Sequence, residues 1–187
     1  MRVTGGSARG IRLRSPRGTD IRPTMDRVRS ALFNIIAPFG MEGAFVADLF
    51  AGTGAIGIEA LSRDAAYADF IESNQEHCRH ILINLGEAKV KERATVHHMT
   101  VENSIETLSN SYKFMFMDPP YSQPFPVNVI EQIASRGLLQ KDGLLVVGHS
   151  SRIQSASQCS GLVRWQDRRY GDASLAFYRY ESAEGYV

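Results

Sequence analysis

The fold is decided by one stretch of sequence, Asp48-Leu-Phe-Ala-Gly52-Thr-Gly54-Ala-Ile-Gly57. It follows an apolar segment, residues 44–48, that is typical of a short strand, and it leads into residues 56–62, whose apolar spacing is that of a helix. Glycines let the backbone turn sharply and approach a ligand closely. A strand, a glycine-rich turn and a helix in this order predict an α/β sheet that binds a ligand at the carboxyl ends of its strands.

Outward from this turn, strand patterns alternate with helix patterns. The expected strands cover residues 44–48, 67–71, 94–98, 113–117 and 144–148, and the expected helices cover residues 56–62, 75–85, 101–108 and 127–134. This alternation predicts a mostly parallel, doubly wound sheet. Two final strands, 162–168 and 175–180, surround a turn and predict a closing antiparallel hairpin, which brings the sheet to seven strands.

The N-terminal part of the chain precedes this alternation. Residues 2–4 and 9–14 flank a pair of glycines and are expected to form a short β-hairpin. A helix is expected to open at Pro23, with Thr24 as its N-cap, and to end before Pro38. We therefore expect two parts, a basic arm or hairpin over residues 1–22 and the main domain over residues 23–187.

The N-terminal arm is strongly basic. Residues 1–29 contain eight arginines, two aspartates and no lysine, a net charge of +6, whereas the rest of the chain carries −5. Arginine binds phosphate bidentately and stacks on bases. The asymmetry therefore favours an arm that contacts nucleic acid over a solvated tail without a partner. The candidate RNA-binding residues are Arg9, Arg12, Arg14 and Arg22.

The remaining composition is that of a soluble globular protein. The chain has 187 residues, 43% of them hydrophobic and 22% charged, and no apolar run is long enough to span a bilayer. No secretory signal is expected, and the two cysteines lack a CxxC context. The histidines have no nearby cluster of acids or cysteines. We expect a cytoplasmic protein with buried thiols and no metal.

The glycine turn lies near two carboxylates that narrow the choice of ligand. Glu72 ends the second expected strand, twenty residues after Gly52, where a carboxylate can accept hydrogen bonds from both hydroxyls of a ribose. The glycine spacing fits a dinucleotide as well as S-adenosylmethionine. Asp48 favours the second ligand, because a carboxylate there repels a pyrophosphate and suits a cationic amino group. Phe50 is expected in the core or on the floor of the cofactor pocket.

A second motif, Asp118-Pro-Pro-Tyr121, follows the buried strand 113–117 at the same edge of the sheet. The two prolines fix φ, so the Asp118 carboxylate and the Pro119 carbonyl become two acceptors in a fixed geometry. Two acceptors are what the N–H pair of an exocyclic amine needs. Tyr121 can stack on a planar base. This motif predicts methyl transfer to an amino nitrogen of a base.

The amine needs this help because its lone pair is delocalised into the ring. Hydrogen bonds accepted from both N–H groups draw electron density to the nitrogen, so that its lone pair can point at a sulfonium methyl. Most of the acceleration is positioning and preorganised electrostatics. Full deprotonation by Asp118 before the attack is not required.

The chain resembles the RsmD-type methyltransferases, the 16S rRNA (guanine(966)-N2) family, over nearly its whole length. The most specific block is Arg22-Pro-Thr-Met-Asp26-Arg-Val-Arg29, followed by Leu32-Phe-Asn34. The other matching motifs are Gly5-Gly6 with Arg9-Gly10, the glycine turn leading into Glu59-Ala-Leu-Ser-Arg63, the Asp118–Tyr121 motif and Tyr170-Gly-Asp172.

This resemblance implies a class I, Rossmann-like, S-adenosylmethionine-dependent domain that methylates a guanine N2 in 16S rRNA, either free or in the 30S particle. It also implies that residues 22–34 pack over the cofactor site and that the arginine hairpin grips RNA. We expect a monomer without an obligate protein partner. The cofactor contacts expected on this basis are Thr24, Arg27, Asp48, Phe50, Gly52, Gly54, Glu72, Ser73 and Val101.

The chain departs from the family pattern in three places. Asp64 stands where a glycine is more usual, and His149 replaces a more usual acid at the end of the fifth expected strand. The segment Met99-Thr-Val101 lacks the acid often found near the adenine. These departures concern individual contacts and leave the expected reaction class unchanged.

Other interpretations stay open from the residues alone. An NAD-dependent oxidoreductase fits the glycine spacing but leaves the Asp118–Tyr121 motif and the arginine arm without a role. A non-catalytic RNA-binding module would need neither Asp118 nor the glycine turn. A methyltransferase acting on adenine N6, cytosine N4 or protein glutamine remains within the same reaction class. Nothing in the spacing separates guanine N2 from adenine N6.

Overall fold

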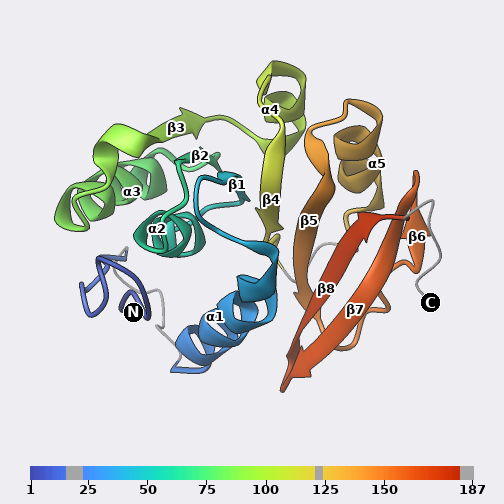
Figure 1. Ribbon diagram of the computed structural model, residues 1–187, viewed down its shortest axis with the longest axis horizontal. Coiled ribbons are helices and arrows are strands. Elements are labelled where there is room, and N and C mark those ends of the chain that lie inside the picture. Colours follow the sequence, from blue (N-terminus) through green and yellow to red (C-terminus); the bar gives the residue numbers. More distant parts are fainter. Residues whose placement is uncertain (16–22, 121–123, 182–187) are drawn as a thin grey trace.

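In a computed structural model of the chain, eight strands of the described residues form one sheet in the order β3-β2-β1-β4-β5-β8-β7-β6 (Figure 1). The structure describes residues 1–15, 23–120 and 124–181, with the backbone alone for residues 23–25. The strands are β1 (Phe45–Leu49), β2 (Tyr67–Glu72), β3 (Ala94–His98), β4 (Tyr112–Met117), β5 (Leu139–Ser150), β6 (Gln158–Cys159), β7 (Leu162–Tyr170) and β8 (Ala173–Tyr180).

Strands β1 to β5 are parallel, and β1 lies between β2 and β4. The chain leaves β3 at the edge and re-enters the sheet at β4, so strand order reverses between β1 and β4. Open α/β sheets bind ligands at such a reversal, outside the carboxyl ends of the strands. Strand β8 runs antiparallel to β5, and β7 runs antiparallel to β8. The predicted mostly parallel sheet with a closing antiparallel hairpin is confirmed.

Two details of the sheet differ from the sequence prediction. The two-residue strand β6 pairs with β7 and adds an eighth strand to the seven expected, because so short a strand leaves no periodic pattern. Strand β5 begins at Leu139 rather than at residue 144. Its register against β4 shifts between Tyr112 and Phe114, and this irregularity lets residues 139–143 continue the pairing.

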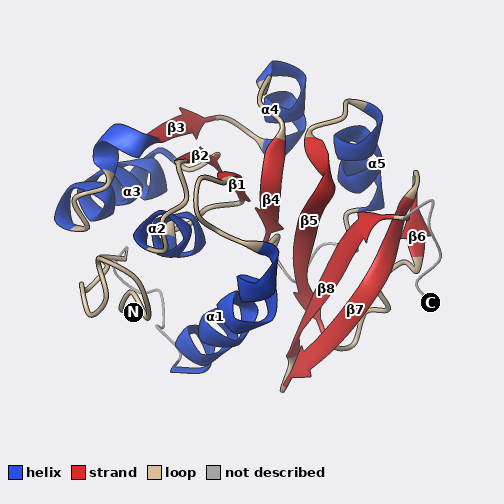
Figure 2. Ribbon diagram, in the orientation of Figure 1, coloured by secondary structure: helices blue, strands red, loops and turns tan. Residues whose placement is uncertain are grey.

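Helices cover both faces of the sheet (Figures 1 and 2). They are α1 (Pro23–Ile36), α2 (Ala55–Ser62), α3 (Gln75–Glu87), α4 (Val101–Thr107) and α5 (Val127–Ser135), with the 3-10 turns η1 (Ala37–Phe39) and η2 (Lys91–Arg93). Helix α1 begins at Pro23, a favoured first helical residue. The prediction of Thr24 as N-cap is therefore wrong, because Thr24 lies inside the first turn.

The N-terminal segment, residues 1–15, pairs with itself less than expected. Its β-pairing is a single bridge between Arg2 and Arg12, supported by a 3.0 Å hydrogen bond from Val3 N to the Ile11 carbonyl. The segment packs on helices instead, because Val3 and Leu13 are buried in the core cluster that also contains residues of α1 and α2. It is held by the domain rather than by its own strands.

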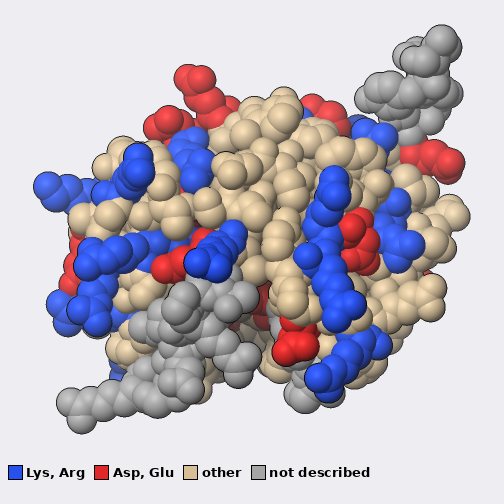
Figure 3. All heavy atoms as spheres, turned by 90° about the horizontal axis from the view of Figure 1, so that it is seen from below, with Lys and Arg blue, Asp and Glu red and all other residues tan. Residues whose placement is uncertain are grey.

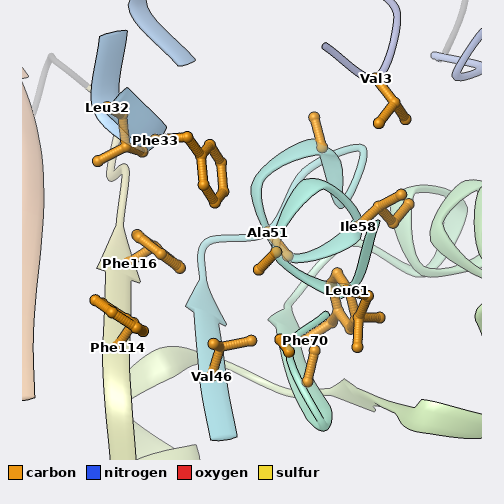
Figure 4. Close-up of a cluster of buried hydrophobic side chains, with 14 of the residues drawn as sticks. Val3, Leu32, Phe33, Val46, Ala51, Ile58, Leu61, Phe70, Phe114 and Phe116 are labelled. Carbon is orange, nitrogen blue, oxygen red and sulfur yellow. The ribbon is translucent and has the colours of Figure 1, made fainter. Parts of the chain in front are cut away.

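A core rich in phenylalanine joins α1 and α2 to the sheet (Figure 4). Phe33 of α1 lies 5.9 Å from Phe116 of β4, measured between ring centroids. Helix α2 approaches β2 closely at Gly57, where an added Cβ would stand 2.4 Å from Phe70 Cε1. The third glycine of the turn therefore lets α2 lie directly on β2, and this packing fixes the turn above it. No helix in the described part of the chain is long and apolar enough to cross a membrane.

Candidate functional site

The glycine turn between β1 and α2 is held in a conformation that few residues adopt. Phe50, Gly52 and Gly54 all have positive φ, at 62°, 54° and 74°. Phe50 is the costly one, because a side chain in the left-handed region crowds its own backbone. The turn thus combines glycine freedom with one strained aromatic residue at the end of β1. Strain at such a position is common where a loop is shaped for a ligand.

Two carboxylates accept hydrogen bonds from the backbone of this turn and of the helix that follows it. Asp48 is buried at the end of β1, and its Oδ2 accepts a 2.9 Å hydrogen bond from Gly57 N. Glu72, at the end of β2, accepts 2.8 Å hydrogen bonds from Gly52 N through Oε2 and from Asn74 N through Oε1. The two predicted acids therefore lie together under the turn. Each carboxylate oxygen keeps a second lone pair with which it can accept a hydrogen bond from a ligand.

The charge state of Asp48 is unusual. Burial raises the pKa of Asp48 to about 8, and the negative charges of Asp118 and Glu72 add to the shift, while the Gly57 N–H opposes it. Asp118 acts on Asp48 because the ends of β1 and β4 are adjacent, as the Asp118 N to Leu49 carbonyl contact of 3.4 Å shows. Three acids thus surround one small region, which favours a ligand that brings positive charge.

The Asp118 motif begins where β4 ends. Pro119 is buried and Pro120 is exposed. The Asp118 carboxylate lies against Gly148 of β5, which has no side chain to displace it. Tyr121, predicted as the base clamp, lies outside the described residues. The structure therefore brings the first two predicted members of the motif to the edge that carries the glycine turn.

A shallow hollow, open to solvent, adjoins Pro119 and Gly148. Its walls are mostly apolar and come from two places, the proline-rich segment before α5 and the end of β5. Phe125 and His149 meet edge to face, with ring centroids 5.4 Å apart. The lining residues are Pro119, Pro120, Pro124, Phe125, Pro126, Gly148, His149, Ser150 and Ile153. The hollow lies next to Asp118, whose carboxylate contacts Gly148.

The other predicted cofactor contacts are spread more widely. Ser73 is exposed just after Glu72, and its carbonyl accepts a 3.0 Å hydrogen bond from His98 Nε2. Val101 is buried as the first residue of α4. Arg27 is exposed on α1, and the Thr24 side chain lies outside the described residues. Ser73 lies beside the glycine turn through Glu72, and within the described residues no hydrogen bond or ion pair joins the Arg27 side chain to that turn.

The predicted RNA-binding arginines lie on one side of this edge. Arg9, Arg12 and Arg14 are exposed on the N-terminal segment, whereas Arg22 lies outside the described residues. Arg14 also has a structural role, because its guanidinium forms an ion pair with Glu87 of α3, with Nη2 and Oε1 2.6 Å apart. Figure 3 looks onto this edge and shows basic side chains in two groups, one toward the N-terminal segment and one toward the β7–β8 hairpin.

Two buried polar residues that the sequence analysis did not select tie the N-terminal segment to the domain. Glu59 of α2 is fully buried and binds Arg29, Arg63 and Thr4; the Thr4 N to Glu59 Oε2 distance is 2.8 Å. Asn84 of α3 bonds the backbone N–H and carbonyl of Arg14. The same Asn84 amide donates a 3.0 Å hydrogen bond to the Thr53 carbonyl in the glycine turn.

A weak signal for the first of these residues existed in the sequence. Glu59 stands in a block shared with the family resemblance, and an acid in the middle of an apolar helix demands a cationic partner. Asn84 and Gly148 carry no such signal, because their roles depend on segments far away in the chain. Over the described residues, no group of three or more metal-binding side chains comes together.

The chain is similar in sequence to known methyltransferases over most of its length. The model of the family described as "Conserved hypothetical protein 95" matches residues 1–179. The "Putative rRNA methyltransferase YlbH" of Bacillus subtilis is 30% identical over 182 residues, which cover 96% of this chain and 98% of that protein. The "Ribosomal RNA small subunit methyltransferase D" of Escherichia coli is 35% identical over 147 residues, covering 79% of this chain and 73% of the relative.

Solved structures show the same architecture. The structure described as "Putative methyltransferase yhhF from Escherichia coli" superposes with a TM-score of 0.85 at 28% identity, covering 97% of this chain and 98% of that one. A more distant structure, described as "SMU.776, a putative methyltransferase complexed with SAH", has a TM-score of 0.66 at 14% identity, and the match covers 84% of this chain and 50% of that one. The second likeness concerns the fold alone.

Proposed function

The chain belongs to the RsmD-type family of ribosomal RNA methyltransferases, and from that premise we propose that it transfers a methyl group from S-adenosylmethionine to the N2 amine of a guanine in 16S rRNA. The observation that carries the proposal is the meeting of Asp118 and the glycine turn at adjacent strand ends. Asp118 lies close enough to Asp48 to raise its pKa. One site can therefore hold both a methyl donor and an amine.

The residues under the glycine turn fit the proposed cofactor. Asp48 and Glu72 offer carboxylate oxygens, and the turn presents backbone without intervening side chains at Gly52 and Gly54. A cationic amino group would be stabilised beside Asp48, and a pyrophosphate would be repelled by the three acids. S-adenosylmethionine supplies an electrophilic methyl group on a sulfonium. The same three acids disfavour the pyrophosphate of NAD, and therefore an NAD-dependent reaction.

Asp118 and Pro119 act on the acceptor. The Asp118 carboxylate and the Pro119 carbonyl each accept a hydrogen bond from the exocyclic amine, which turns the nitrogen lone pair out of the ring plane and toward the donor. On transfer, S-adenosylhomocysteine would be the leaving group, and the methylated nitrogen, now cationic, would give one proton to the Asp118 carboxylate. In this proposal Tyr121 stacks on the ring of the base beside Pro119. Positioning and fixed dipoles supply most of the rate.

The substrate is proposed from sequence motifs and relatives, whereas the reaction is proposed from the geometry of the site. Guanine N2 and 16S rRNA are supported by the RsmD-type motifs, above all the block from Arg22 to Asn34. The names of the curated relatives support a ribosomal RNA. Arg9, Arg12 and Arg14 provide an exposed basic segment that phosphates can contact. Thr24, Arg27, Phe50, Ser73 and Val101 complete the proposed cofactor environment.

The test is transfer of labelled methyl from S-adenosylmethionine to unmethylated 30S particles, naked 16S rRNA and duplex DNA, followed by nucleoside analysis. N2-methylguanosine in rRNA is the expected product. Label in N6-methyladenine or N4-methylcytosine would retain the chemistry of Asp118 and overturn the guanine assignment. No transfer to any nucleic acid, despite cofactor binding, would overturn the proposed function.

A matched pair of variants tests the role of Asp118. Asp118→Asn removes the charge and replaces one acceptor with a donor, so transfer should fall at least a hundredfold while S-adenosylhomocysteine still binds. Asp64→Asn makes the same chemical change on an exposed turn after α2 and should keep full activity. Full activity in Asp118→Asn would exclude the proposed mechanism.

A further inference from the structure

Three arginines stand exposed at the carboxyl end of β5 and the tip of the β7–β8 hairpin. They are Arg152, Arg168 and Arg169, here termed the C-terminal arginine cluster. Their contacts are superficial. Arg152 Nη2 is 4.0 Å from Asp172 Oδ1, with both side chains 84% exposed, and Arg169 Nε donates to the Gly171 carbonyl at 3.0 Å. Arg168 Nε and Nη2 donate to the Gln166 side-chain oxygen at 2.8 and 2.6 Å on the same strand. Ion pairs this exposed contribute little to stability, so folding alone does not account for the cluster.

A neighbouring arginine shows the contrast. Arg164 of β7 is partly buried, and its Nη1 donates to the Ser155 carbonyl at 2.8 Å and lies 3.9 Å from Asp167 Oδ2. Ser155 also donates a 2.5 Å hydrogen bond to the same Asp167 oxygen. Arg164 is thus engaged inside the protein, whereas the three residues of the cluster are exposed, with Arg168 and Arg169 on opposite faces of β7.

The cluster begins at the rim of the hollow beside Pro119. Ser150 and Ile153 line that hollow, and Arg152 lies between them in the same turn. Ser151 N donates a 2.9 Å hydrogen bond to the Asp172 carbonyl, which ties this turn to the tip of the hairpin. Strand pairing fixes the other end of the cluster. Arg169 pairs with Ser174, and Ser174 pairs with His149.

The register gives the distance from the proposed catalytic residue. Strands β4, β5, β8 and β7 are neighbours in that order, so β7 lies three strand spacings from the strand that ends in Asp118. At about 4.8 Å per spacing, the cluster lies on the order of 14 Å from that strand. The N-terminal segment lies on the other side of this edge from the β7–β8 hairpin (Figure 1), and basic side chains gather toward both (Figure 3). The site is therefore flanked by basic residues on two sides.

We propose that the C-terminal arginine cluster binds phosphates of the RNA on one side of the target nucleotide, opposite the phosphates held by the N-terminal segment. This inference rests on the proposed function, since it concerns the same RNA. Phosphate contacts set the position of a nucleic acid without reading its sequence. Contacts on one side leave the strand free to swing about that anchor. Contacts on both sides hold the base between them over the hollow.

A competing explanation comes from the sheet edge. Strand β6 covers only Leu162 and Val163 of β7, and in the described part of the chain no strand pairs with the outer edge of β7 beyond them. Charged side chains on such an edge prevent pairing with other molecules. If this were the whole role of Arg168 and Arg169, their removal would promote self-association and leave RNA binding intact.

The experiment compares two double variants of the full chain. Arg168→Gln with Arg169→Gln removes two charges from the cluster. Arg136→Gln with Lys141→Gln removes two charges from exposed positions at the opposite end of β5. Binding to unmethylated 30S particles and to naked 16S rRNA is measured directly across a salt series, separately from methyl transfer. S-adenosylhomocysteine binding and light scattering are measured alongside, and Arg152→Gln provides an independent single variant.

The expected result is a roughly tenfold loss of RNA affinity in the cluster variant at low salt, with a salt slope shallower by about 1.4 to 1.8. Arg152→Gln should lose about half as much in logarithmic affinity, and the control variant should bind like the wild type. Equal affinity and slope in the cluster and control variants would overturn the proposal, as would self-association without any loss of RNA binding. Because binding is measured apart from catalysis, failure of methyl transfer would not mask either outcome.

Discussion

Gly148 and Asp118 lie so close that a Cβ added to the glycine would stand 2.4 Å from Asp118 Oδ1. The contact joins the ends of two neighbouring parallel strands, and it sets where the carboxylate can lie. An alanine at position 148 would push the carboxylate out of its place or force the two strands apart. The position of the proposed amine acceptor therefore depends on a glycine one strand away.

Gly148→Ala should abolish most methyl transfer and lower stability by about 1 to 3 kcal/mol, the usual cost of overpacking. Binding of S-adenosylhomocysteine, measured by calorimetry, should be retained, because the glycine turn is untouched. Gly86→Ala is the control, since an added Cβ there meets nothing within 4 Å and the residue is inside α3. That variant should be as stable as the wild type or slightly more so. Wild-type activity in Gly148→Ala would refute the positional role.

The raised pKa of Asp48 predicts that ligand binding releases a proton. With its pKa at about 8, Asp48 is mostly protonated at pH 7 in the free protein. A cationic amino group placed beside it favours the carboxylate and lowers the pKa, so binding of S-adenosylhomocysteine should release up to one proton and should strengthen from pH 6 to pH 8. Calorimetry in two buffers with different ionisation enthalpies counts the protons. A count of zero at pH 7 would contradict this arrangement.

The same group makes stability depend on pH. The pKa of Asp48 is raised in the folded protein from 3.8 to about 8, so its contribution to the free energy of unfolding is fully present below pH 4 and is lost as the pH rises to 8. Asp48→Asn has no proton to lose and should be more stable than the wild type at pH 8, by up to about 5 kcal/mol, with the difference vanishing near pH 4. Urea unfolding at both pH values measures this. A constant difference would rule out Asp48 as the source.

Glu59 should be among the most costly acidic residues to replace. It is fully buried, and its loss would leave Arg29, which is 4% exposed, without its buried carboxylate partner. Breaking a buried pair in this way costs about 3 to 5 kcal/mol. Glu59→Gln should therefore shift the urea midpoint strongly, whereas Glu106→Gln on the exposed face of α4 should shift it little. Equal midpoints for the two variants would show that the network does not stabilise the fold.

Asn84 should connect the N-terminal segment to cofactor binding. Its amide is fully buried and bonds Arg14 and Thr53 together. Asn84→Asp keeps the acceptor but loses both donated hydrogen bonds, so the glycine turn should loosen and S-adenosylhomocysteine affinity should fall about tenfold. Arg14→Gln removes only the outer ion pair and should keep that affinity. Loss of affinity in both variants alike would point to the arginine side chain instead.

The parts of the site that the sequence predicted are those carried by a single continuous motif. Asp48, Gly52 and Gly54 lie within ten residues of one another, and the strand-turn-helix pattern fixes their relation without knowledge of the rest of the chain. The position of Glu72 could also be predicted, because it ends a strand that runs parallel to β1 and finishes at the same edge of the sheet. Asp118 could be assigned to that edge for the same reason, although its contact with Gly148 could not.

The parts that the sequence did not predict depend on pairing between distant segments. Asn84 is hydrogen-bonded to the backbone of Arg14, seventy positions earlier in the chain. Buried Glu59 is paired with Arg29 of α1, thirty positions earlier. Periodicity reports which face of a helix is apolar but not which partner covers it. The expected N-terminal hairpin consists of one bridge only, because the segment packs on α2 and α3, and that packing is not visible in its own sequence.

The Arg14–Asn84 link also sets an order of events during synthesis. Arg14 leaves the peptidyl-transferase centre seventy residues before its buried partner, a delay of roughly 4 to 14 s at 5 to 20 residues per second. Contacts this distant in sequence form late in folding, because the entropy cost of closing a long loop comes before the stabilising contact is made. The N-terminal segment is thus translated early and docked late. A nascent chain stalled before α3 would carry its N-terminal arginines without the buried Asn84 amide that holds the Arg14 backbone.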